Sequence, residues 1–174
     1  MAQPQKFISL VDGRLVEGTI ESVDASTGAP DADKLVRLGG DGRLNKSVLP
    51  LGVGDDAISM PASENLAGGD FVNVWSDAGV PSARKADATA AGKEADGFVL
   101  DAVAAGQPAT VFFEGRNSGL SSLTVGARYY LSATTPGATV TVPPAAPGNV
   151  VQFLGRATTP TSLAFEATDG VILA

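Results

Sequence analysis

The chain has 174 residues, enough for one domain with a hydrophobic core, or for a small domain with an extended arm, without disulfides or metals. It contains no cysteine and no histidine, which excludes a disulfide framework, a thiolate nucleophile, an imidazole base and a Cys/His zinc site. Its 12 basic and 19 acidic residues give a net charge of −7, which opposes the counterion release that drives nucleic-acid binding. We therefore expect no nucleic-acid partner.

Glycine and proline account for 21 and 11 residues, a frequency typical of strands separated by turns. Aromatic residues make up only 6% of the chain, so we expect a thin core. Residues 1–7 have no apolar run like that of a signal peptide, and no uninterrupted apolar stretch is long enough to span a bilayer. These features predict a soluble all-β protein with no membrane partner.

The first region is predicted to contain two hairpins. Residues 7–11 and 14–20 are β-prone and flank Asp12-Gly13, a dipeptide favoured where φ must be positive. Residues 33–38 and 43–50 flank a glycine-rich turn in the same way. We expect an extended N-terminal arm and hairpin region over residues 1–56.

A boundary is predicted within residues 52–56, where two glycines and two carboxylates interrupt the apolar pattern. Residues 57–174 then form a small antiparallel β-barrel or sandwich, because short β-prone runs alternate there with turn residues. The Ala-rich segment 86–95 has no apolar stripe and is expected to be an exposed loop. The predicted strands are 70–75, 97–103, 109–114, 128–132, 139–142, 150–155, 163–166 and 171–173.

Motifs that resemble catalytic or ligand sites lack the context they need. Residues 52–57 match the spacing of a dinucleotide-binding fingerprint, but Pro61 follows where a helix should begin. Without histidine, a serine nucleophile would need a lysine or a carboxylate as its base. The sequence therefore predicts a protein that is not an enzyme and needs no cofactor.

Acidic residues offer the remaining options for chemistry. A glycosidase needs two carboxylates, but acidic residues at strand ends are usually solvated. A calcium site needs several oxygen ligands, and the available spacing does not match an EF-hand loop. We predict no catalytic, cofactor or metal residues. The candidate carboxylates are Asp55, Asp56, Glu114 and Glu166 for a glycosidase, and Asp31, Asp33 and Asp41 for calcium.

Five aromatic residues are the candidate interaction residues. They are Trp75, Phe112, Phe113, Tyr129 and Tyr130. Adjacent residues in a strand point to opposite faces, so one ring of each pair is expected in the core. The other is exposed or buried in a subunit contact, because aromatic rings are enriched at interfaces. This pattern and the thin core predict a homo-oligomer, a trimer being the expected form.

Two sets of residues resemble virion proteins of tailed bacteriophages. Residues 31–50, with the sequence DADKLVRLGGDGRLNKSVLP, look like a segment that recurs in tail-fibre, baseplate and head-decoration proteins. A second set is similar to small β-barrel modules of phage structural proteins, including capsid decoration proteins. It comprises residues 65–74, 83–88, 97–99, 123–132 and 151–157.

The resemblance implies a decoration (cement) protein that binds the outside of a capsid in many copies, often as trimers, and stabilises the expanded shell. Its partner would be the major capsid protein, and its location the virion surface after assembly in the bacterial cytoplasm. An N-terminal arm over roughly residues 1–30 could lie on the shell or exchange between neighbours. The alternative is a tail-fibre, baseplate or receptor-binding component. A third hypothesis for the function is a polysaccharide depolymerase.

Overall fold

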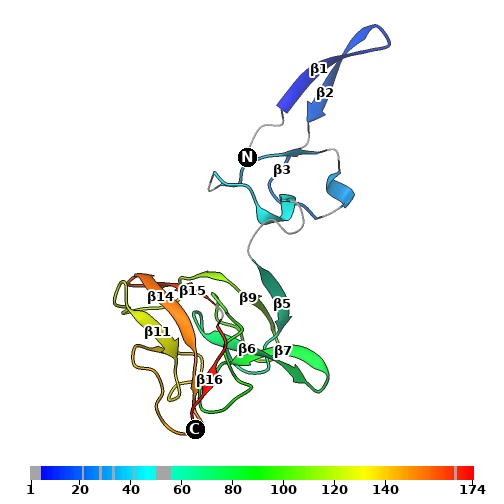
Figure 1. Cartoon of the computed structure of the whole chain (residues 1–174). Coiled ribbons are helices and arrows are strands. Elements are labelled where there is room, and N and C mark those ends of the chain that lie inside the picture. The colour runs from blue at the N-terminus through cyan, green and yellow to red at the C-terminus, as the bar shows by residue number, and fades with distance from the viewer. Residues whose placement is uncertain are drawn as a thin grey trace. The chain divides into compact units, whose positions relative to one another are not determined.

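The computed structural model describes residues 5–20, 22–27, 29–32, 34–40, 42–49, 56–166 and 168–174. The chain divides into two compact units, Met1–Gly54 and Asp55–Ala174. Residues 52–55 of the expected boundary lie outside the described residues, as do Asp33 and Asp41 of the calcium candidates. Figure 1 shows the strands of both units with their labels.

The first predicted hairpin of the N-terminal unit is confirmed. Strand β1 (Gln5–Val11) pairs antiparallel with β2 (Arg14–Ile20). Asp12 and Gly13 have φ values of 50° and 74°. Positive φ at both central positions is what a two-residue hairpin turn requires, which explains the Asp-Gly sequence.

The second predicted hairpin is wrong. Strand β4 (Leu35–Val36) pairs in parallel with β3 (Ser22–Val23), and Lys46–Val48 form a 3-10 turn instead of a strand. The side-chain oxygen of Asn45 accepts hydrogen bonds from the Ser47 N–H at 3.0 Å and the Ser47 hydroxyl at 2.8 Å. Such local side-chain bonds compete with strand pairing. A second 3-10 turn covers Ala29–Asp31.

The C-terminal unit contains two five-stranded antiparallel sheets. In the first sheet the order is β5-β9-β8-β6-β7, and in the second it is β10-β15-β14-β11-β12. Strands β13 and β16 form a separate pair. The bounds are β5 (Ala57–Pro61), β6 (Phe71–Asp77), β7 (Val80–Lys85), β8 (Gly97–Phe98), β9 (Pro108–Phe112), β10 (Gly115–Asn117), β11 (Arg128–Leu131), β12 (Thr139–Val140), β13 (Val150–Val151), β14 (Phe153–Thr159), β15 (Ser162–Phe165) and β16 (Val171–Ile172).

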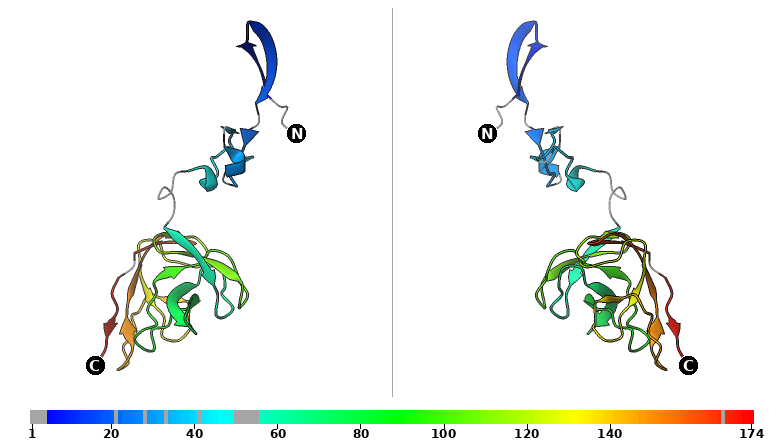
Figure 2. Two further views of the ribbon diagram at one scale, coloured as in Figure 1. Left: turned by 90° about the vertical axis from the view of Figure 1, so that its right-hand side faces the viewer. Right: turned by 90° about the vertical axis from the view of Figure 1, so that its left-hand side faces the viewer.

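The all-β prediction is confirmed, with the two sheets packed as in a sandwich. At the edges of the first sheet, Ala62 and Ala83 form an isolated bridge, and the Ser63 N–H donates to the Ala83 carbonyl at 2.8 Å. The five strands do not form a closed barrel. The C-terminal strand β16 pairs antiparallel with β13 and lies beside it in Figure 2, red beside orange. No helix among the described residues is long and apolar enough to cross a membrane.

Four strands were not predicted from the sequence: β3, β5, β7 and β10. Strand β7 has the sequence VPSARK, and its Pro81 lies in an edge strand, where a missing N–H is tolerated. Strand β10 (Gly115–Asn117) has no apolar residue to mark it. The predicted strand over residues 97–103 is shorter than expected and ends at Phe98.

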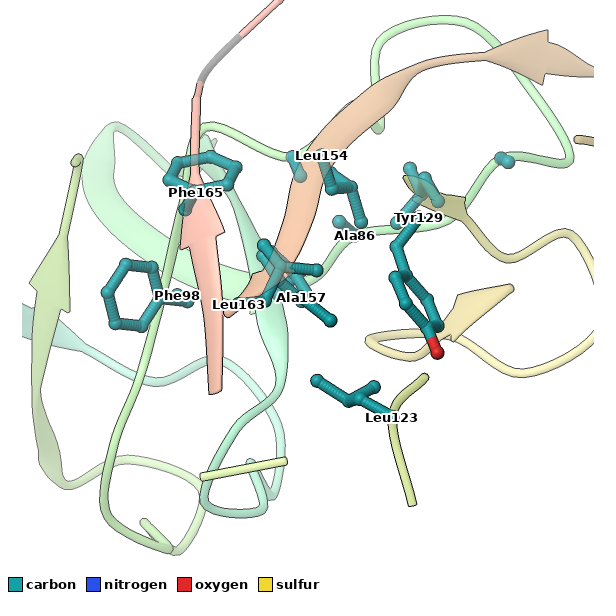
Figure 3. Close-up of a cluster of buried hydrophobic side chains, with 12 residues drawn as sticks. Ala86, Phe98, Leu123, Tyr129, Leu154, Ala157, Leu163 and Phe165 are labelled. Atoms are coloured by element: carbon teal, nitrogen blue, oxygen red, sulfur yellow. The ribbon is translucent and has the colours of Figure 1, made fainter. Parts of the chain in front are cut away.

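One hydrophobic core lies between the two sheets and is called here the inter-sheet core. The rings of Phe71 and Phe98 come from the first sheet, and Phe165 from the second lies 5.4 and 5.7 Å from them, centroid to centroid. Tyr129 extends beside Leu123 in the same cluster (Figure 3). The remaining buried members are Ala86, Ala88, Ala95, Leu131, Leu154, Ala157 and Leu163.

The expectation that residues 86–95 form an exposed loop is half wrong. The segment has no regular structure, but Ala86 and Ala88 are fully buried and Ala95 is buried too. Small side chains let the backbone pass close to the core, which a search for an apolar stripe does not detect. A second core covers the other face of the first sheet and comprises Met60, Ala62, Leu66, Val72, Ala83, Val99, Ala109 and Val111.

Candidate functional site

The C-terminal unit has a groove of about 840 Å³, called here the carboxylate groove. Three acidic residues, Glu94, Asp96 and Asp169, line it beside the apolar side chains of Val74 and Phe113. Ala95, Gln152, Thr168 and Gly170 complete its lining. None of the three carboxylates has an ion-pair partner among the described residues.

A buried amide fixes one side of the groove. The Gln152 side chain accepts a hydrogen bond from the Ala95 N–H at 2.7 Å and donates to the carbonyls of Ala95 and Thr168, both at 2.9 Å. It therefore pairs with the Ala95 backbone as a neighbouring strand would. The Thr168 hydroxyl donates to the Phe153 carbonyl at 2.7 Å. These bonds attach the C-terminal segment to the second sheet.

Asp96 is the most strongly held of the three acids. One of its carboxylate oxygens accepts hydrogen bonds from the Val74 N–H at 2.7 Å and from the Asn73 amide at 3.1 Å. Burial raises the pKa of Asp96 above its usual 3.8, and the Glu94 carboxylate raises it further. The hydrogen bonds from Val74 and Asn73 and the charge of Arg84 act in the opposite direction.

Replacing Asp96 separates its hydrogen bonding from its charge. Asp96→Ala leaves the half-buried Val74 N–H without its acceptor and should cost about 1–3 kcal/mol. Asp96→Asn keeps an acceptor oxygen without a charge, so we expect it to be at least as stable as the parent at pH 7. The pKa of Asp96 is higher in the folded than in the unfolded protein. On acidification the carboxyl is therefore protonated in the folded protein before it is protonated in the unfolded chain, and the free-energy cost of the buried charge is removed.

The advantage of Asp96→Asn over the parent should therefore shrink as the pH falls through the raised folded-state pKa toward the ordinary value of 3.8. Urea unfolding of both proteins between pH 7 and pH 3.5 measures this difference. If the stability advantage of Asp96→Asn over the parent grew on acidification, the pKa of Asp96 would not be raised in the folded protein.

Trp75, one of the five predicted interface residues, takes part in a network next to Asp96. The Arg84 guanidinium lies 4.8 Å from the Trp75 ring centroid and donates to the Asn73 side-chain oxygen at 2.9 Å. The indole N–H donates to the Ser63 hydroxyl at 3.1 Å. Trp75 is half-buried and connects the first sheet to the segment after β5.

The other four aromatic residues also have partners within their own unit. Phe112 stacks on Phe98 at a centroid distance of 5.5 Å, and Phe113 packs against the second core. Tyr129 is buried, and its hydroxyl accepts a hydrogen bond from the Thr124 N–H at 2.9 Å. Tyr130 is half-buried and lies 5.8 Å from the Phe153 ring centroid. Their role in a subunit contact remains a prediction.

The acidic candidates for catalysis and for calcium do not come together in the groove. Asp56, Glu114 and Glu166 are exposed, and none of them lines it. Asp31 accepts hydrogen bonds from the Thr27 N–H and hydroxyl, which lower its pKa to about 2. Within the described ranges no group of three or more acidic side chains is placed to hold a metal ion.

The N-terminal unit carries a different kind of candidate site. Seven of its large apolar residues are exposed, and they are called here the N-terminal apolar surface. None of its described residues belongs to either core. The exposed fractions are 71% for Ile8, 76% for Leu15, 44% for Val16, 54% for Leu35, 50% for Val36, 55% for Leu38 and 50% for Leu44.

Charge is also unevenly divided between the units. Residues 1–54 contain six basic and seven acidic residues, for a net charge of −1. Residues 55–174 contain six basic and twelve acidic residues, for a net charge of −6. A nearly neutral unit with exposed apolar residues is suited to association, whereas a strongly acidic one resists it. Sequence reasoning identified the segments of the N-terminal unit but not this exposure.

Comparison with known proteins does not assign the chain to a family. No family model matches it, and no curated protein matches it at a significant level.

Proposed function

We propose that this chain is a non-enzymatic structural protein of a tailed-phage virion that binds the outer surface of the capsid and stabilises the shell. The observation that carries the proposal is the N-terminal apolar surface. About 54 residues with no described core residue need another protein surface to bury their apolar side chains. The resemblance of residues 31–50 to virion proteins supports the same reading.

The segment proposed to contact the major capsid protein is 35–44. It carries Leu35, Val36, Leu38 and Leu44, all at least half exposed. Burying one such side chain contributes about 1.5–3 kcal/mol. Contacts of this size at many equivalent positions add through multivalency.

Binding of this protein would stabilise the shell because it is coupled to the equilibrium between immature and expanded shells. A protein that binds the expanded shell and not the immature one shifts the equilibrium toward the expanded state. The acidic C-terminal unit would face outward, where its net charge of −6 keeps decorated particles apart. No catalytic group is needed for this role.

Binding of the full chain to purified shells of the parent phage tests the proposal. The protein should sediment with expanded shells and not with immature ones. The double substitution Leu35→Lys with Leu38→Lys should weaken binding more than tenfold, because two apolar contacts are lost. Val125→Lys with Val142→Lys is the matched control, since these valines are 59% and 76% exposed in the C-terminal unit. Absence of binding to either kind of shell would refute the proposal.

The alternative is a component of the tail fibre, the baseplate or the receptor-binding apparatus. It is favoured by the same segment 31–50, whose likeness extends to tail proteins. Antibody labelling of intact virions separates the two: label on the head supports the shell proposal, and label at the tail tip supports the alternative.

A further inference from the structure

Three arginines form a line across the second sheet, called here the arginine row. Arg116 in β10 and Arg156 in β14 both pair with Ala164 of β15, and Arg156 pairs on its other side with Arg128 of β11. Directly paired residues of neighbouring strands point to the same face of a sheet, so the row crosses four adjacent strands on one face. Figure 1 shows β11, β14 and β15 of this sheet side by side.

The arginine row lies on the outer face of the sheet. Leu163 and Phe165, on either side of Ala164 in β15, are buried in the inter-sheet core, so Ala164 and the arginines paired with it point away from that core. All three arginines are exposed. The backbones of Arg116 and Arg156 are two strand spacings apart, about 10 Å, with only a methyl side chain between them. Both guanidinium groups can therefore reach one ligand group above Ala164.

The arginine row is a positive patch on an acidic unit. Residues 55–174 carry a net charge of −6 and contain six basic residues, three of which form the row. The other three have partners: Arg84 lies over the Trp75 ring, and Lys85 and Lys93 are ion-paired with aspartates at 3.4 and 3.9 Å. None of the arginines of the row has an ion-pair partner among the described residues.

The free protein holds these like charges together at a cost. Arg128 and Arg156 are directly opposite each other, and like charges in such a pair destabilise a sheet. Glu114 and Glu166 directly precede β10 and follow β15 in the chain, yet neither is ion-paired with the row. An anionic ligand would remove the repulsion, because a guanidinium binds a carboxylate or phosphate through two parallel hydrogen bonds.

The size of the face limits the class of ligand. Strands β10 and β11 have only three and four residues. The face from β10 to β11 is therefore about 14 Å across and about 13 Å long, or roughly 190 Å². Stable protein interfaces bury about 800 Å² per partner, so this face is too small for a folded protein. It can accommodate a few units of a narrow polymer.

The chemistry of the face separates the polymers. An extended peptide gains affinity from main-chain hydrogen bonds at a sheet edge, whereas the backbone groups beneath this face are paired within the sheet. A densely charged polymer such as nucleic acid is repelled by the net charge of −6. A polymer with widely spaced anionic groups, recognised by side chains alone, meets both conditions.

Aromatic rings lie next to the arginine row. Tyr130, two residues from Arg128 in β11, pairs with Phe153 of β14, and their ring centroids are 5.8 Å apart. Both rings are half-buried, and Val140 pairs with Tyr130 on its other side. Apolar ring surfaces can pack against the C–H groups of a sugar ring, and the Tyr130 hydroxyl can exchange hydrogen bonds with sugar hydroxyls.

We propose that the outer face of the second sheet binds an acidic polysaccharide. The carboxylate or phosphate groups of the polysaccharide bind the arginine row, and its sugar rings pack against Tyr130 and Phe153. This site lies in the C-terminal unit and not in segment 35–44. It goes beyond shell binding and would stand equally for a tail protein.

Electrophoresis of the full-length protein in native gels that contain polysaccharide tests the proposal, with a gel that lacks polysaccharide as the reference. Polygalacturonate supplies carboxylates and phosphomannan supplies phosphates. At least one of them should retard the protein at low salt, and added salt should weaken the effect. Neutral dextran should not retard it.

Variants locate the binding surface. Arg116→Gln with Arg156→Gln should weaken binding more than tenfold, because two charge-assisted contacts are lost. Lys85→Gln with Lys93→Gln removes the same charge from the same unit and is the matched control, which should bind like the parent. Tyr130→Ala should weaken binding about fivefold. Unchanged Trp75 fluorescence confirms that each variant is folded.

Three outcomes overturn the proposal. Retardation by neither acidic polysaccharide excludes the site. Equal weakening by the lysine control shows that only net charge matters. Tighter binding to poly-glutamate than to either polysaccharide indicates an acidic protein as the partner. Shell binding is measured separately with the same arginine variant, which should retain it, so failure of this inference is distinguishable from failure of the proposed function.

Discussion

Replacing Gly155 by alanine is expected to destabilise the C-terminal unit by more than about 4 kcal/mol, an exceptional cost for one methyl group. Gly155 is buried in β14 with φ at +143°, and it pairs with Phe165 on one side and Tyr129 on the other. A Cβ atom here would overlap the Ala164 carbonyl oxygen and approach a Leu163 methyl to 2.8 Å. Backbone and core would both have to move.

The matched control is Gly148→Ala. Gly148 has φ at +82°, and nothing lies within 4 Å of the position its Cβ would take. Only backbone strain applies there, at a cost of about 1–2 kcal/mol. Urea unfolding followed by fluorescence of Trp75, the single tryptophan, measures both variants. Equal losses in the two would show that Gly155 is not sterically required.

The substitution Phe98→Ala should cost about 3–5 kcal/mol, through lost burial and the cavity left behind. Phe98 is 1% exposed, and its ring lies 6.3 Å from Phe71, 5.5 Å from Phe112 and 5.7 Å from Phe165, measured between centroids. It therefore joins rings of both sheets. Loss of this side chain should weaken the packing of one sheet on the other.

Phe153→Ala removes the same side chain from a half-buried position, where it contacts Tyr130 and Arg128. We expect a loss of about 1 kcal/mol there, because much of the ring is already in water. Thermal unfolding of the two variants compares them directly. If Phe153→Ala proves as costly as Phe98→Ala, the inter-sheet core is not centred on Phe98.

Much of the fold could be predicted because it depends on local chemistry. Asp12-Gly13 supplies the two positive φ values of the first hairpin, and β-prone runs marked most strands of the C-terminal unit. Local chemistry also explains the failure at residues 43–50, where the Asn45 side chain bonds to Ser47 and a 3-10 turn forms. The sequence contains this competition, but its outcome is too finely balanced to be read without the structure.

Composition by itself determined that any chemistry here would have to proceed without histidine or cysteine, and the order of turns and apolar runs determined an all-β chain. Only the tertiary structure decided which segments meet. The Gln152 side chain binds the backbone of Ala95, 57 residues away, and the carboxylate groove assembles from five separate segments. Likewise, apolar residues look alike in a sequence whether they are buried, as Leu131 is, or exposed, as Leu15 is. Burial depends on what packs against a side chain, which is a property of contacts between distant segments and not of local composition.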